Sequence, residues 1–263
     1  MTTQATASRG AVAALARVDG RKLLFSPIFL SGLVLSLVGV GIFVQTVRTD
    51  ATATWRVDAW TVGAGSIILA LLAMVAANRA GLRDWREETV DQHEALPLGT
   101  SMRLAGLLGG VAWPATVAMV PVALAAVWAS TRLEVPPVTT IHVIQTGVLV
   151  LMLGALGLAL ASWIPSGFVA PVVAFAFYVV HPGEYEQAWH AAWPFSFMST
   201  VSLASWHVVY LLGLTLILIV AADLRGSRGR GGLAALTVGV VAVTVSLAAI
   251  LPNACVSPGN CLL

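Results

Sequence analysis

A chain of 263 residues in which 58% of the residues are hydrophobic and only 10% are charged lacks the composition of a soluble protein, whose domains carry about 25% charged residues. A formal net charge of +2, without a basic cluster interleaved with exposed aromatic residues, excludes a nucleic-acid-binding protein. The chain is expected to be all-α, a polytopic helical membrane protein, because a bilayer cannot hydrogen-bond bare backbone groups.

The basic N-terminal segment, residues 1–22, precedes an apolar run from Leu23 to Val47. That run is longer than the apolar region of a signal peptide, which has about 7–15 residues. We therefore interpret the run as a retained first span.

Seven apolar runs reach or approach the roughly 20 residues that a membrane-spanning helix needs. The fifth is short, and we expect it to be less tilted or partly re-entrant. Six to seven spans are thus predicted, in a transmembrane domain of residues 23–251. The runs are residues 23–46, 59–78, 103–128, 139–162, 166–181, 203–222 and 232–251.

The lysine and arginine residues predict the orientation, since cytoplasmic loops carry an excess of them. With the N-terminus in the cytoplasm, eleven lie inside and three outside, in a plasma or inner membrane. Tryptophans gather at the predicted outer ends, and Trp163 lies at an inner end. The inside residues are Arg9, Arg17, Arg21, Lys22, Arg79, Arg83, Arg86, Arg103, Arg225, Arg228 and Arg230; the outside residues are Arg48, Arg56 and Arg132.

The largest inside segment, residues 79–102, mixes charges of both signs with one tryptophan. One interpretation is an ordinary solvated loop. The sharper hypothesis is a helix that docks a soluble protein, because a mixed-sign face suits a protein surface better than an anionic lipid surface. The residues expected to make that contact are Arg83, Trp85, Arg86, Glu87, Glu88, Asp91 and Glu94.

The order of these segments resembles the permeases of ATP-binding cassette (ABC) exporters of the second class, which have the type V fold. The resemblance covers about residues 11–222. It ends there, because the family usually stops after six spans with the C-terminus inside. The matching segments are residues 11–27 (amphipathic elbow and start of span one), 86–97 (coupling segment), 163–167 (short inside turn) and 183–202 (outer segment).

The resemblance implies a permease subunit without catalytic activity or cofactor, which pairs with an identical or different second permease subunit. It also implies that spans one, two and five line the path and that residues 1–22 form a cytoplasmic amphipathic elbow. The only lysine is Lys22, so a Gly-x-x-x-x-Gly-Lys-Ser/Thr loop is absent. ATP would therefore be bound and hydrolysed by a separate cytosolic ATPase subunit. The substrate and the direction of transport stay open.

Two other classes of function are weighed against the permease. One is a membrane scaffold or assembly protein that transports nothing. The other is an ion-coupled transporter, which usually places ionisable residues within its spans. Few such residues are found here, and Gln145 is the most notable polar residue inside a span.

Two further patterns have both a structural and a functional interpretation. Gly106 with Gly110, and Ala155 with Ala159, allow close helix approach, and we favour packing within the bundle over a dimer face. Several histidines and glutamates lie in or near the outer segment. We interpret them as interfacial residues rather than metal ligands, and thus predict no metal site. They are His142, His181, Glu184, Glu186, His190 and His207.

The tail, residues 252–263, is expected outside if residues 232–251 form a seventh span. Disulfides persist there, and the Pro-Gly pair between Cys255 and Cys261 favours a tight turn. We therefore predict a Cys255–Cys261 disulfide. The alternative is that residues 232–251 re-enter from the inside, which leaves two reduced thiols in the cytoplasm.

Overall fold

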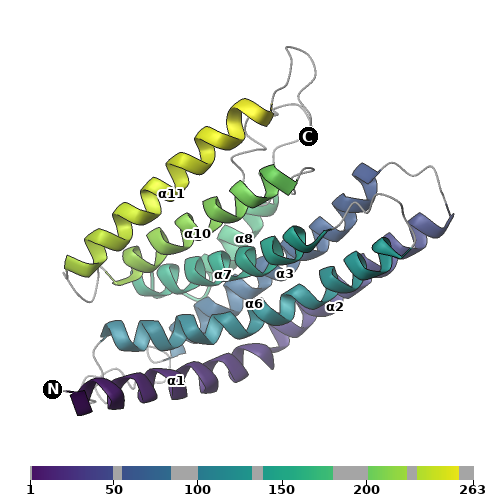
Figure 1. The fold of residues 1–263 in the computed structure, drawn as a ribbon. Helices are drawn as coiled ribbons and strands as arrows, with labels where there is room; N and C mark the ends of the chain where they lie inside the picture. Colours follow the sequence, from purple (N-terminus) through teal and green to yellow (C-terminus); the bar gives the residue numbers. More distant parts are fainter. Residues whose placement is uncertain are drawn as a thin grey trace.

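The computed structural model describes residues 2–49, 55–83, 100–131, 139–179, 201–223 and 230–254. This part of the chain is helical and contains no strand, which confirms the all-α prediction. The helices are α1 (Thr2–Leu24), α2 (Pro27–Thr49), α3 (Trp55–Gly81), α6 (Thr100–Ser130), α7 (Thr140–Trp163), α8 (Val169–Val179), α10 (Val201–Asp223) and α11 (Arg230–Ala254) (Figure 1).

Five described helices are long and apolar enough to cross a membrane. They coincide, within a few residues, with five of the seven predicted runs. The chain is therefore a multi-pass membrane protein by the length and composition of its helices. The five apolar stretches are Pro27–Thr46, Gly63–Gly81, Met102–Ser130, Thr140–Trp163 and Ala204–Asp223.

The other two predicted runs correspond to shorter apolar helices. The fifth run forms α8, which has 11 residues. At about 1.5 Å per residue it extends about 16 Å, roughly half of the hydrocarbon thickness. The seventh run lies in α11, whose apolar stretch is Ala234–Ile250. A sixth and a seventh span stay predictions.

The break between α1 and α2 sets the start of the first span. Pro27 has no N–H to continue α1 and disfavours a helical conformation at Ser26. The backbone N–H of Ser26 therefore closes a tight turn onto Leu23 O at 3.1 Å. The spanning helix thus begins at Pro27, four residues later than predicted, because Leu23 still belongs to the last turn of α1.

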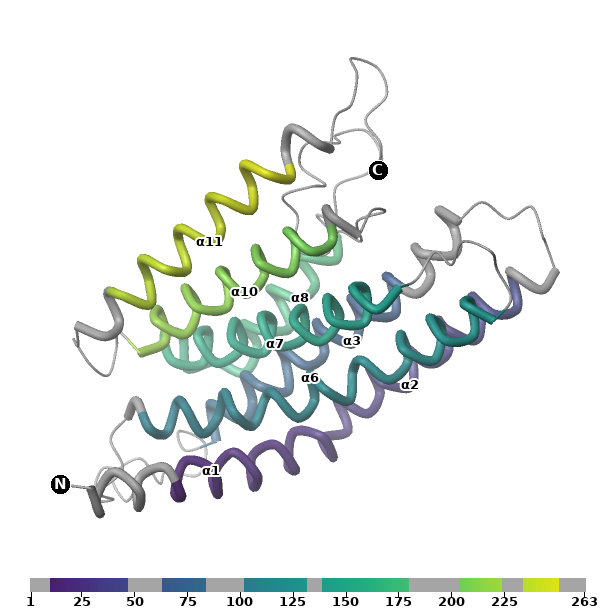
Figure 2. The backbone as a smooth tube through the Cα atoms, viewed as in Figure 1, coloured from purple at the N-terminus to yellow at the C-terminus, as the bar shows by residue number. Residues whose placement is uncertain are grey.

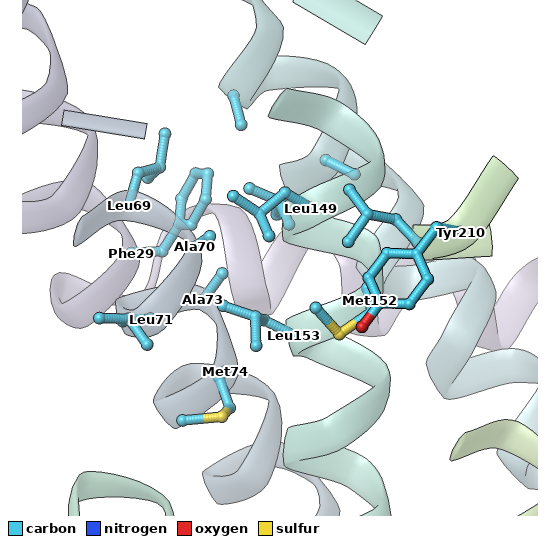
Figure 3. Close-up of a cluster of buried hydrophobic side chains, with 14 residues drawn as sticks. Phe29, Leu69, Ala70, Leu71, Ala73, Met74, Leu149, Met152, Leu153 and Tyr210 are labelled. Carbon is cyan, nitrogen blue, oxygen red and sulfur yellow. The ribbon is translucent and has the colours of Figure 1, made fainter. Parts of the chain in front are cut away.

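The helices run roughly side by side, with α7 in the middle of the bundle (Figure 1). Helix α7 packs against α3, α6 and α10, while α11 lies on the outer side of α10. The main core lies between α2, α3, α7 and α10, as Figure 3 shows for Phe29, Leu69, Leu153 and Tyr210. Its position leaves the two ends of the bundle available for polar groups.

Glycines of α6 bring α1 close along its side, as the backbone trace shows (Figure 2). A Cβ built at Gly106 would lie 2.9 Å from Leu15 Cβ, and one at Gly110 would lie 3.0 Å from Gly20 N. The Gly106–Gly110 pair therefore packs inside the chain, as favoured from the sequence. The Ala155 and Ala159 side chains are also buried.

Candidate functional site

Charged residues gather where α1 and α3 end and α6 begins. The Asp19 carboxylate is almost fully buried, with a side-chain exposure of 9%. Arg83 Nη2 donates a hydrogen bond to Asp19 Oδ1 at 2.7 Å. Arg103, on the first turn of α6, lies close enough to both groups to interact with them electrostatically. Three helices therefore meet at one ion pair.

A cavity of about 490 Å³ opens beside this ion pair. We call it the basic pocket. Cationic and polar groups line it together with small apolar side chains. The lining residues are Asp19, Lys22, Leu23, Ser26, Ala76, Arg79, Ala80 and Arg83.

The sequence spacing of these residues explains why their side chains line the same pocket. Four lie at positions 19, 22, 23 and 26, in and directly after α1, and four lie at positions 76, 79, 80 and 83, in and directly after α3. Both sets have the i, i+3, i+4, i+7 spacing of a single helix face. Two helix ends that face each other thus place every lining side chain toward the same space.

Arg83 is the only residue of the predicted ATPase-coupling set that the structure describes, and it lies in the basic pocket. Its partner Asp19 was not predicted. The other predicted site residues lie outside the described residues. They are Trp85, Arg86, Glu87, Glu88, Asp91, Glu94, Cys255 and Cys261. The residues interpreted as interfacial rather than metal-binding in the outer segment, His181, Glu184, Glu186 and His190, also lie outside the described residues.

A second polar group lies within the bundle, between α3, α7 and α10. Gln145 Nε2 lies 2.9 Å from His207 Nδ1, and both side chains are buried. The two side chains form one hydrogen bond across the helices, whose direction depends on the tautomer of the imidazole. The Tyr210 ring lies 5.6 Å from that of His207, between centroids. Thr146 follows Gln145 in α7, and its Oγ1 lies 3.4 Å from Ser66 Oγ. We call these residues the polar layer.

His142 and His207, which the sequence predicts to be interfacial, lie near the starts of α7 and α10 and are packed within the protein. Both are buried, with exposed fractions of 4% and 0%. His142 Nδ1 accepts a hydrogen bond from the backbone N–H of Thr139 at 3.1 Å, and His207 is bonded to Gln145. The partner of His142 is therefore the N-cap of its own helix, whereas that of His207 lies on another helix.

Trp163 keeps its predicted place at a helix end. Its ring is 54% exposed, and its indole Nε1 donates to Ala221 O at 2.8 Å. Ile164 after it is extended (φ −128°, ψ 93°), as the following Pro165 requires, so α7 ends there. An interfacial position of Trp163 stays a prediction, with which its place at the helix end agrees.

Among the described residues, no group of three or more His, Cys, Asp or Glu side chains is placed to bind a metal ion. The two polar sites of the described residues are therefore the basic pocket and the polar layer. Comparison with family models, curated proteins and solved structures finds no match to the chain.

Proposed function

We propose that this chain is the membrane-spanning permease subunit of an ABC exporter. In this proposal a separate cytosolic ATPase supplies the energy, and a second permease subunit completes the translocation path. The observation that supports it best is the Asp19–Arg83 ion pair. It joins α1, the helix predicted to be the elbow, to the end of α3, at the point where the chain enters the predicted coupling segment.

The predicted coupling segment connects α3 to α6, and α1 contacts both helices. On α3 the contact is the ion pair of Asp19 with Arg83. On α6 it is the close approach of Leu15 to Gly106. A force applied to residues 84–99 therefore acts on α1, α3 and α6 together. A coupling segment needs this rigidity, because a loop attached to one loose helix would absorb the motion.

The test is recovery of the ATPase with the tagged chain, purified in mild detergent from its own host. The wild-type chain should bring down a protein with a Gly-x-x-x-x-Gly-Lys-Ser/Thr loop. The double variant Glu87→Lys, Glu88→Lys should recover about tenfold less of it or lower, because a like-charge contact at an interface costs several kcal/mol.

The matched control is the double variant Glu184→Lys, Glu186→Lys. It makes the same reversal in the predicted outer segment and should recover the ATPase as the wild type does. If both double variants recover the same amount, residues 87 and 88 do not dock the ATPase. If the wild type recovers no ATPase with such a loop, the proposed function is wrong.

The second permease subunit needs a surface on this chain. Only 22% of the apolar window of α2 is buried, and Ala170 is the only buried residue of α8. The Gly63–Gly81 stretch of α3, by contrast, is 67% buried within the chain. Helices α2 and α8 are therefore better candidates than α3 for contact with a second subunit. Crosslinking in native membranes should give a dimer, and a purely monomeric pattern would count against this assignment.

One observation favours an ion-coupled transporter as the second candidate. His207 is an ionisable side chain that is fully buried within the Ala204–Asp223 stretch. Such residues often mark ion pathways. The pull-down separates the two candidates, because an ion-coupled transporter requires no ATPase partner.

A further inference from the structure

The basic pocket carries more positive charge than its own carboxylate can balance. Lys22, Arg79 and Arg83 line it and Arg103 lies close by, against the single carboxylate of Asp19. Arg83 is already engaged with Asp19. Within the part of the chain that the structure describes, the side chains of Lys22 and Arg79 make no ion pair or hydrogen bond. Both residues are exposed.

The position of the basic pocket matches the headgroup level of a bilayer. It lies where α1 gives way to the apolar stretch that starts at Pro27, and where the apolar stretch of α3 ends at Gly81. The predicted orientation places this end on the cytoplasmic side. Leu23, Ala76 and Ala80 add apolar surface to the lining, beside the charged residues. A ligand suited to this site carries a negative group attached to an apolar body.

We propose that the basic pocket binds the phosphate group of an anionic phospholipid from the cytoplasmic leaflet. Basic pockets between membrane helices bind phosphate headgroups by charge attraction, and each lysine or arginine strengthens the binding. Lys22 and Arg79 hold the phosphate from two helices. The Asp19–Arg83 pair fixes the spacing between them. This proposal does not depend on the proposed transport function.

The only lysine of the chain permits a direct test, since Lys22 carries its only side-chain amine. The full chain is placed in nanodiscs of phosphatidylcholine, or of phosphatidylcholine and phosphatidylglycerol in equal parts. An amine-reactive acylating reagent is added, and mass spectrometry follows modification of Lys22. The N-terminal amine reports the general effect of the anionic surface. Phosphatidylglycerol should slow modification of Lys22 several-fold more than that of the N-terminal amine.

Arg79→Gln and Arg21→Gln form a matched pair of variants. Each removes one exposed cation from this end of the bundle, but only Arg79 lines the pocket. Arg79→Gln should weaken the protection by phosphatidylglycerol roughly fivefold, the effect expected for one basic residue at a lipid headgroup. Arg21→Gln should keep it. Equal loss in both variants would show a general surface effect and overturn the proposal, as would unprotected Lys22 in the wild type.

Native mass spectrometry of the detergent-purified chain gives a second measurement. The wild type should retain bound phosphatidylglycerol, and Arg79→Gln should retain less while eluting as the same species in gel filtration. Equal retention by the two would overturn the assignment to Arg79.

Two further experiments identify the molecule that carries the negative group bound in the pocket. Inorganic phosphate added to phosphatidylcholine nanodiscs should protect Lys22 weakly, because it lacks the apolar body. Protection equal to that by phosphatidylglycerol would overturn a lipid as the ligand. If Lys22 is already protected in phosphatidylcholine alone, and Glu87→Lys with Glu88→Lys removes that protection, the chain's own acidic segment fills the pocket. That result would also overturn the proposal.

Discussion

Gly157 of α7 faces the backbone of α3, and replacing it with alanine is expected to push the two helices apart. A Cβ at this position would overlap Met74 O and lie 3.1 Å from the backbone nitrogen of Asn78. Gly157 O also accepts a hydrogen bond from Asn78 Nδ2 at 3.2 Å. Separation of the helices would break that bond, which is buried.

Whether Gly157→Ala stabilises or destabilises the protein depends on the relative size of three free-energy contributions. Where the methyl group has room, replacing glycine by alanine in a helix gains up to about 1 kcal/mol. At Gly157 the overpacking costs about 1–3 kcal/mol, because a backbone carbonyl cannot rotate out of the way. Loss of the buried hydrogen bond costs about 1 kcal/mol more. The free energy of unfolding should therefore fall by about 1–3 kcal/mol.

The assay is unfolding in mixed micelles by titration with sodium dodecyl sulfate, followed by tryptophan fluorescence. Two other glycine-to-alanine variants calibrate it. At Gly147 the new methyl would meet the flexible end of the Met119 side chain, and at Gly41 it would meet nothing within 4 Å. Gly147→Ala should be nearly neutral and Gly41→Ala neutral or slightly stabilising. If Gly157→Ala is as stable as Gly41→Ala, α7 and α3 do not pack in this register.

Three other perturbations test the remaining contacts. A double-mutant cycle of Asp19→Asn and Arg83→Gln should give a coupling energy of about 1–2 kcal/mol in the same unfolding assay. This value is above that of an exposed ion pair because Asp19 is buried. A coupling energy near zero would contradict the ion pair. A cycle of Gln145→Met and His207→Leu should give about 1 kcal/mol, within the range of hydrogen bonds between membrane helices; additive effects would contradict their contact. A membrane-impermeant thiol reagent on intact cells should label the two tail cysteines only after reduction, and labelling only after lysis would refute both the disulfide and a seventh span.

The spans could be predicted from the sequence because length and hydropathy are enough to identify them. The end of α7 at Trp163 also agrees with the predicted end of the fourth run, because hydropathy falls there. The start of α2 was misplaced because hydropathy alone ignores the break that Pro27 imposes. In each of these places the local chain contains the determining residue, so one sequence is sufficient.

Contacts between helices could not be predicted in the same way. Asp19 pairs with Arg83 across 64 positions of sequence, and Gln145 meets His207 across 62. Each pairing depends on the rotation of two helices about their own axes. In a soluble helix the apolar stripe fixes that rotation, but here the lipid-facing and core-facing residues are both apolar.

The residues that do mark the inward face of these spans are small or polar. On α7, Gln145 and Thr146 are buried, as are Gly154 and Gly157, while the large apolar Ile144 is 41% exposed. A polar group facing lipid would lack a hydrogen-bond partner, and a glycine facing lipid would forgo close packing. The small and polar residues of α7 therefore mark its inward face, whereas its large apolar residues do not, since Leu149 and Leu153 are buried and Ile144 is exposed. Applied to α10, this rule directs His207 inward, and it is the sequence signal from which the polar layer follows.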